Sequence, residues 1–162
     1  MAHRARSHLP LRGGMIALDT NILVYAHRED SEWHDAAFAC VAQLAESGGA
    51  WAIPAPCFHE FLAIVSHPRI YRPPTPMQLA LDQVDAWRES PSLQVLAEGE
   101  GYWERLHALV LSSRVAGAQV HDARVAALCL HHGVTELWTA DRDFGRFPEL
   151  RTRNPVIDTR SS

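Results

Sequence analysis

The chain contains no lysine, since all fifteen of its basic residues are arginines. P-loop nucleotide-binding enzymes, Schiff-base enzymes and kinase-like sites each depend on a lysine amine, so the sequence excludes these classes. Receiver-type phosphoacceptor domains, which also build an acidic pocket on an α/β sheet, are excluded for the same reason.

Cysteine is also scarce, and long apolar runs are absent. Cys40, Cys57 and Cys129 are widely spaced and form no CxxC pair, so we expect reduced, buried thiols and neither a zinc site nor a disulfide framework. No apolar run approaches the roughly 18 residues of a membrane span, and residues 1–14 lack the apolar stretch of a secretory signal. We therefore expect a cytoplasmic protein with no membrane partner.

Positive charge is concentrated at the N-terminus. Three arginines precede Met15, which leaves twelve basic and nineteen acidic side chains in residues 15–162, a net charge of −7. Proteins that hold nucleic acid through a wide basic surface have the opposite sign, so any such contact must be local or mediated by metal.

Four arginines that have aromatic neighbours are candidates for local RNA contacts. They are Arg69, Arg72, Arg142 and Arg146. The alternative is a solvated arginine face over aromatic core residues, and the sequence does not separate the two. His121, which precedes Asp122, is a further candidate for an RNA contact, and the simpler interpretation is a partly exposed residue at the start of a helix.

The length of 162 residues and the hydrophobic content of 47% predict one domain with a proper core. Residues 1–14 are rich in Arg and His, show no periodicity and end in two glycines, so we interpret them as a disordered N-terminal extension. Met15 is then an alternative start, and residues 15–162 form the single domain.

Apolar periodicity predicts strands that alternate with helices. The expected strands are 16–18, 50–53, 93–96, 136–140 and an edge strand at 155–158. The expected helices are 31–46, 56–67, one marked by Leu79, Leu81, Val84 and Trp87, then 102–115 and 122–132, with a turn at 19–21. This alternation predicts an α/β protein, a three-layer α/β/α sandwich around a mainly parallel sheet.

Four acidic residues occupy positions from which they are expected to meet. Asp19 and Asp141 each end an apolar run, so both should emerge at the carboxyl edge of the sheet, where open parallel sheets bind ligands. Glu60 and Asp122 lie near the starts of predicted helices. Four crowded carboxylates repel one another unless a hard cation neutralises them, and oxygen-only ligands select Mg²⁺ or Mn²⁺. Such an ion supports hydrolysis without a protein nucleophile.

Taken singly, most of these acids have simpler explanations. Asp19 fits an Asx turn, Asp122 fits a helix N-cap, and Asp141 fits an ordinary turn. Asp143 is either a fifth acid beside the metal or a cap for the following turn. Glu60 is harder to explain in this way, because its helix is strongly apolar.

The order of these motifs resembles that of the PIN-domain family, and in particular VapC-type toxins of bacterial toxin–antitoxin systems. The resemblance rests on Asp19-Thr-Asn21 after a strand, on Pro56-Cys-Phe-His-Glu60-Phe-Leu, on Val120-His-Asp122-Ala and on Trp138-Thr-Ala-Asp141-Arg-Asp143-Phe. It covers about residues 15–155. Each motif alone is weak, but the ordered set is specific.

The resemblance implies a metal-dependent endoribonuclease with an α/β/α sandwich, usually a homodimer, that a cognate antitoxin holds inactive. On this basis the chain is expected to be the toxin of a type II toxin–antitoxin system and to cut RNA with Mg²⁺ or Mn²⁺. The resemblance implies that the catalytic quartet is Asp19, Glu60, Asp122 and Asp141. It implies that Asp19, Asp122 and Asp141 bind the metal, and that Glu60 and Asp143 are further candidate ligands. It makes Asp143 an accessory acid, Thr139 the hydroxyl residue shortly before the last acid, and Asn21 a brace for Asp19.

Two other functions stay open. One is a non-catalytic module that keeps this fold and acts through protein contacts, against which the intact quartet argues. The other is a PIN-like nuclease with another nucleic acid as substrate, such as branched DNA. That activity needs additional helical segments, for which a body of 148 residues leaves little room.

Overall fold

The short apolar runs of the sequence form the middle of a parallel sheet. The structure is a computed structural model that describes residues 14–158. Within them, five strands follow the order β3-β2-β1-β4-β5, and each neighbouring pair is parallel. The strands are β1 (Ile16–Leu18), β2 (Trp51–Pro54), β3 (Leu93–Leu96), β4 (Glu136–Trp138) and β5 (Thr152–Arg153). The predicted extension at 1–14 falls outside the described residues except for its last glycine.

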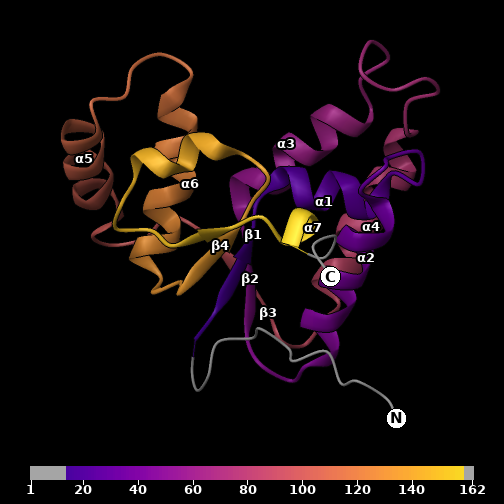
Figure 1. Ribbon diagram of the computed structural model, residues 1–162, viewed down its shortest axis with the longest axis horizontal. Coiled ribbons are helices and arrows are strands. Elements are labelled where there is room, and N and C mark those ends of the chain that lie inside the picture. The colour runs from indigo at the N-terminus through magenta and orange to yellow at the C-terminus, as the bar shows by residue number, and fades with distance from the viewer. Residues whose placement is uncertain (1–13, 159–162) are drawn as a thin grey trace.

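Helices cover both faces of the sheet, which confirms the three-layer α/β/α expectation (Figure 1). One face carries α1 (Thr20–His27), α2 (His34–Glu46), α3 (Ala55–Val65), α4 (Met77–Arg88) and α7 (Pro155–Asp158). The other carries α5 (Tyr102–Ser113) and α6 (Gln119–His131), and a 3₁₀ helix, η1 (Arg142–Arg146), follows β4.

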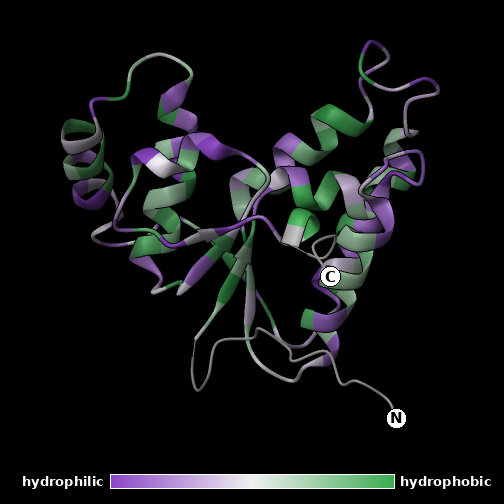
Figure 2. Ribbon diagram, in the orientation of Figure 1, coloured by the Kyte–Doolittle hydropathy of each residue, from purple (hydrophilic) through white to green (hydrophobic). Residues whose placement is uncertain are grey.

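The core lies between these layers and explains why the central strands are continuous apolar runs. All residues of β1 and β2 are buried, as is usual for parallel strands that are covered on both faces. The edge strands β3 and β5 are partly exposed. Figure 2 shows the hydrophobic colour along the middle strands and along α3. The three cysteines are free and buried, as predicted.

The helix α1 was not predicted, because residues 19–21 were interpreted as a turn before an apolar patch. Its residues include Ile22, Val24 and Tyr25, types that favour strands when taken locally. Asp19 caps the first turn, and Ile22, Leu23 and Val24 are all buried. Burial of this segment, which packs against α2 and α3, therefore overrides its local strand propensity.

One further prediction was wrong. Residues 155–158 form the helix α7 and not an edge strand, because Asn154 Oδ1 accepts a 3.2 Å hydrogen bond from Val156 N and Pro155 suits a first helical turn. The last strand is β5, just before it. The helix marked by Leu79, Leu81, Val84 and Trp87 is confirmed as α4. Its buried side is formed by Ala80, Val84 and Trp87, and Leu79 and Leu81 are exposed.

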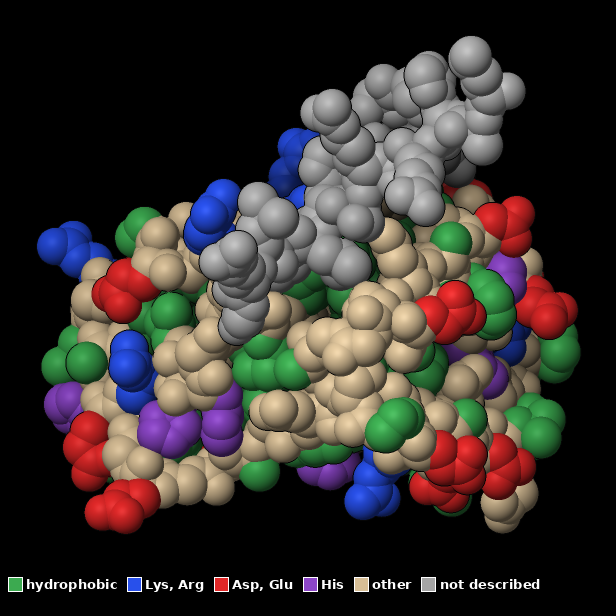
Figure 3. Space-filling view, turned by 90° about the horizontal axis from the view of Figure 1, so that it is seen from below, with side chains coloured by type: hydrophobic (Ala, Val, Ile, Leu, Met, Phe, Trp, Pro, Cys, Tyr) green, Lys and Arg blue, Asp and Glu red, His purple; other side chains and the backbone are tan. Residues whose placement is uncertain are grey.

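The face at the amino ends of the strands has a mixed surface. Figure 3 views it from below, and in its visible described part acidic and basic side chains are interspersed without a continuous basic area. In the described residues, no helix combines the length and the apolar character that a membrane crossing needs.

Candidate functional site

The strands β1 and β4 are parallel neighbours, so their carboxyl ends deliver Asp19 and Thr139 to the same place. The backbone N–H of Asp19 donates a 3.0 Å hydrogen bond to the carbonyl of Trp138, which continues the strand pairing to the edge of the sheet. Asp19 then adopts an extended conformation and becomes the N-cap of α1. The predicted meeting at the carboxyl edge is thus present in the fold.

Four donors hold the Asp19 carboxylate, which is only 5% exposed. Oδ1 accepts from Thr20 N at 2.8 Å and from Cys57 Sγ at 3.7 Å. Oδ2 accepts from Thr139 Oγ1 at 2.8 Å and from Asn21 Nδ2 at 3.3 Å. The carboxylate therefore has one orientation, and a side chain held in this way needs no reorganisation to receive a ligand.

Burial makes this carboxylate hard to ionise. It raises the pKa of Asp19 to about 6, against the hydrogen bonds from Thr139 and Thr20, which lower it. The negative charges of Glu60 and Asp141 contribute smaller parts of this same rise. A cation near these groups would favour the ionised form.

The hydroxyl of Thr139 connects Asp19 to the last predicted acid. It donates to Asp19 and accepts from the backbone N–H of Asp141 at 3.0 Å and from Asn21 Nδ2 at 3.2 Å. The Asn21 amide also accepts from Ala140 N at 3.0 Å. Asn21 and Thr139, two of the three accessory residues named by the resemblance, thus lie between the ends of β1 and β4 and contact both.

The last predicted acids gather at η1. Asp141 caps this 3₁₀ helix, because its Oδ1 accepts from Asp143 N at 2.8 Å. Asp122, from the first turn of α6, joins them, and all three offer carboxylate oxygens within 4.8 Å of one another. Oxygen donors at this spacing fit a hard divalent cation such as Mg²⁺ or Mn²⁺. The tightest group therefore contains Asp143 in addition to two of the three predicted ligands.

Electrostatics agree with this crowding. Burial raises the pKa of Asp122, and the charges of Asp141, Asp143 and Glu60 raise it further. The positive charge of Arg146 lowers the pKa of Asp122, so this arginine acts on the acidic cluster. Arg146 is held at η1 by a 3.2 Å hydrogen bond from its Nε to the carbonyl of Asp143.

Glu60 belongs to the middle of α3, not to its start, and it is exposed. The buried residues of that helix are Cys57, Phe58, Phe61 and Val65. The hydroxyl of Thr20 donates a 2.9 Å hydrogen bond to Glu60 Oε2 and so orients this carboxylate. Thr20 was part of the Asp19 motif, but the sequence analysis assigned it no role.

A cleft of about 610 Å³ contains all four predicted acids. It is lined by Asp19, Thr20, Asn21, Pro56, His59, Glu60, Ile64, Ala118, His121, Asp122, Arg124, Val125 and Asp141. The predicted RNA contacts Arg69, Arg72 and Arg142 are not among these residues, and all three are exposed. His59 and Arg124 line the cleft but were not predicted, because no local sequence pattern shows which face of a helix points toward a cleft formed with other elements.

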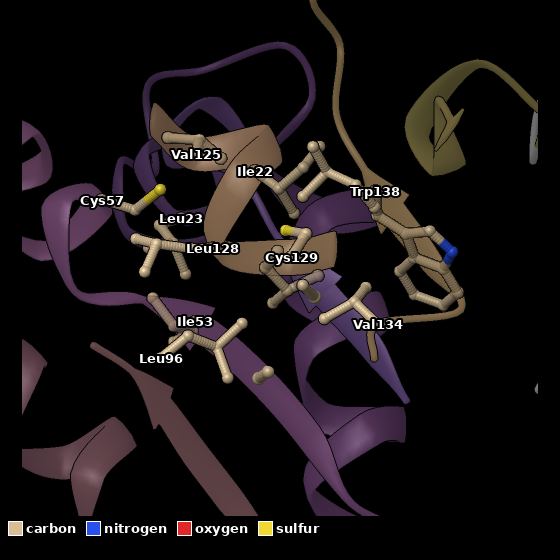
Figure 4. Packing of buried hydrophobic residues seen from close by; sticks show 14 of the residues in the cluster. Ile22, Leu23, Ile53, Cys57, Leu96, Val125, Leu128, Cys129, Val134 and Trp138 are labelled. Carbon is tan, nitrogen blue, oxygen red and sulfur yellow. The ribbon is translucent and has the colours of Figure 1, made fainter. Parts of the chain in front are cut away.

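The hydrophobic core directly supports the cleft. Figure 4 shows Ile22 of α1, Cys57 of α3 and Val125 of α6 in the same buried cluster. Each is three residues from one of the acids along its own helix, so packing of these side chains fixes the helices that carry the carboxylates.

Comparison with known proteins gives a consistent result. A family model described as PIN domain matches residues 16–150. The chain is 34% identical over 142 residues to Ribonuclease VapC43 of Mycobacterium tuberculosis, which covers 88% of this chain and 96% of the relative. It is 28% identical over 137 residues to Ribonuclease VapC48 of the same organism, which covers 85% and 94%.

Two solved structures share the fold. One is the complex titled VapBC2 from Rickettsia felis bound to a DNA fragment from their promoter, with a TM-score of 0.63, 18% identity and coverage of 86% of this chain and 97% of that one. The other is Mycobacterium tuberculosis VapC20, titled a Sarcin-Ricin loop cleaving toxin, with a TM-score of 0.59, 16% identity and coverage of 80% and 92%. At these identities the likeness concerns the fold alone.

Proposed function

This chain belongs to the PIN-domain family, and on that premise we propose that it is a metal-dependent endoribonuclease that acts as the toxin of a type II toxin–antitoxin system. Two relatives that match most of this chain are named ribonucleases. The observation that carries the proposal is the group of Asp122, Asp141 and Asp143, the first two of which line the same cleft as Asp19 and Glu60.

The residues present fit a divalent cation. Asp122, Asp141 and Asp143 would hold Mg²⁺ or Mn²⁺ through carboxylate oxygens, with Asp19 and Glu60 in the cleft that Asp122 and Asp141 line. When bound, the ion would supply Lewis-acid activation of water and neutralise charge that develops on the phosphate.

Other residues of the site position the carboxylates. Thr139, Asn21 and Thr20 hold Asp19 and Glu60 in single orientations through the hydrogen bonds described above. Preorganised carboxylates stabilise a transition state without reorganising during the reaction. The −7 charge of residues 15–162 implies that RNA is held locally, so we expect cleavage of selected single-stranded or folded elements and no bulk degradation.

Two partners belong to the proposal. One is a cognate antitoxin, by analogy with VapBC2 from Rickettsia felis, which shares the fold. The other is a second copy of this chain. The helix α5 exposes Trp103 at 67% and Leu111 at 68%, side chains that an oligomer interface would cover. Light scattering should then report about twice the 18.1 kDa mass of one chain, and a monomer at every concentration would reject the dimer.

The deciding experiment incubates the purified protein with total cellular RNA and Mn²⁺ or Mg²⁺. We expect a small number of defined fragments, no products with EDTA, and no products from Asp141→Asn. If the parent cuts no RNA, or if Asp141→Asn cuts equally well, the protein is better explained as a binding module with this fold.

A further inference from the structure

The walls of the acidic cleft carry side chains that the proposed chemistry does not use. His59 of α3 and His121 of α6 both line the cleft and are exposed, and neither imidazole has a hydrogen-bond partner in the described part of the chain. Arg124, one turn beyond His121, is the arginine among the residues that line the cleft. These three side chains are therefore available to a ligand.

The two walls share one arrangement. On α3 the cleft contacts Pro56, His59, Glu60 and Ile64, at helical spacing on one face. On α6 it contacts Ala118, His121, Asp122 and Val125, again on one face. Each wall thus places a histidine directly before an acid, and an apolar side chain follows one turn later. The α3 and α6 helices lie on either side of the carboxyl ends of the strands (Figure 1).

Arg124 has two neighbours, the carboxylate of Glu98 and the phenol of Tyr102, whose pKa burial raises and the positive charge of Arg124 lowers. Arg124 Nε lies 3.7 Å from Glu98 Oε1, and the two side chains are 41% and 59% exposed. An ion pair this long and this exposed contributes little and exchanges readily for another anion. A phosphate that enters the cleft can therefore replace Glu98 as the partner of this guanidinium.

We propose that His59, His121 and Arg124 form the part of the cleft that binds single-stranded RNA on either side of the phosphate to be cut, an inference that rests on the proposed ribonuclease function. Arg124 contacts a backbone phosphate, and the two imidazoles receive bases. Rings on opposite walls reach the faces of bases only when the bases are unpaired, so the strand must be single. This arrangement answers how a protein with an acidic body and an acidic site retains a polyanion.

Four variants of the full chain test the inference, with a fluorescein-labelled random-sequence RNA oligonucleotide as the probe. Binding is measured by anisotropy with Ca²⁺, and cleavage as kcat/KM with Mn²⁺, over a range of salt concentrations. Arg124→Gln should weaken binding and reduce the slope of log K against log salt by about 0.7, the share of one phosphate on a single strand. Glu98→Gln should raise affinity about two- to fivefold, because the competing carboxylate is gone.

His59→Ala and His121→Ala should each lower affinity by about fivefold or more at every salt concentration. The matched controls are Arg105→Gln and His107→Ala, whose side chains are exposed on α5 and do not line the cleft. They should bind and cut like the parent. Circular dichroism melting of each variant identifies any loss of fold, and the opposite signs expected for Arg124→Gln and Glu98→Gln cannot both come from unfolding.

The outcomes separate this inference from the proposed function. If the parent cuts RNA but the three weakening variants match the controls, the inference is overturned and the nuclease stands. If the parent binds RNA without cutting it and the variants shift binding as stated, the binding residues stand and the catalytic proposal fails. If the parent neither binds nor cuts, both fail.

Discussion

The hydroxyl of Thr139 donates a 2.8 Å hydrogen bond to Oδ2 of Asp19, across 120 positions of sequence. Thr139 Oγ1 also accepts a hydrogen bond from the backbone N–H of Asp141. One hydroxyl therefore sets the relative position of two acids that follow neighbouring strands. A third hydrogen bond, from Asn21 Nδ2 to Thr139 Oγ1, keeps the Thr139 rotamer in place. The orientation of the candidate ligands thus depends on a neutral side chain at the end of β4.

Thr139→Val should remove this link with little change in volume. Outer hydrogen bonds to metal ligands are typically worth 10–100-fold in affinity or activity, so we expect a loss of about that size in Mn²⁺ affinity and in RNA cleavage. Thr139→Ser keeps the hydroxyl and should stay within a few-fold of the parent. Calorimetry and a cleavage assay measure the two effects, and equal behaviour of the valine and serine variants would remove the role assigned to the hydroxyl.

Metal-free stability should depend on pH through Asp19. Its pKa is 3.8 in an unfolded chain and about 6 in the folded protein, so between these values the unfolded state releases a proton that the folded state keeps. Stability therefore falls as pH rises through this window, by at most about 3 kcal/mol. The full cost is present at pH 8 and absent below pH 3.8.

Asp19→Asn should recover part of that cost, about 1–2 kcal/mol at pH 8, because the new amide carries no charge but loses one acceptor for Thr139. Thermal melts in EDTA at pH 8 and pH 4 measure it. The variant should be the more stable protein at pH 8, and its advantage should shrink toward pH 4. An advantage that grows as pH falls would contradict the cause we assign to this pKa.

Metal should stabilise the folded protein, since binding to the native state alone adds stability by mass action. Mn²⁺ should raise the melting temperature, and Asp143→Asn and Asp141→Asn should reduce this shift because both belong to the group within 4.8 Å. Asp85→Asn, an exposed position on α4, is the control and should shift like the parent. A full shift in Asp143→Asn would restrict the ligands to the other acids.

The four predicted acids should all be required for cleavage. Each of Asp19→Ala, Glu60→Ala, Asp122→Ala and Asp141→Ala should lower cleavage of RNA by at least about a hundredfold and leave the fold intact. Glu149→Ala, an exposed acid away from the cleft, should cut normally. Expression of the parent should arrest bacterial growth and Asp19→Ala should not. Arrest by both proteins would point to an action other than hydrolysis.

Local sequence patterns were sufficient to predict an element where the burial of that segment alone decides its structure. The apolar runs before Asp19 and Asp141 indicated buried parallel strands, and the rule for carboxyl ends then brought both acids to one edge. They failed at α1, where branched residues favour a strand locally but three-dimensional burial and the Asp19 cap produce a helix. They also failed at residues 155–158, where an Asn–Pro cap starts a helical turn.

The sequence by itself determined the types of residue at the site, the absence of lysine and the acidic balance, because these follow from composition and from the order of motifs. Only the tertiary structure decided that Thr139 bonds to Asp19, that Asp143 joins Asp122 and Asp141, and that His59, His121 and Arg124 face the same cleft. The reason is physical. These contacts depend on the strand order β3-β2-β1-β4-β5 and on the rotation of α3 and α6 about their axes, which packing against the shared core sets and which no periodicity within one segment contains.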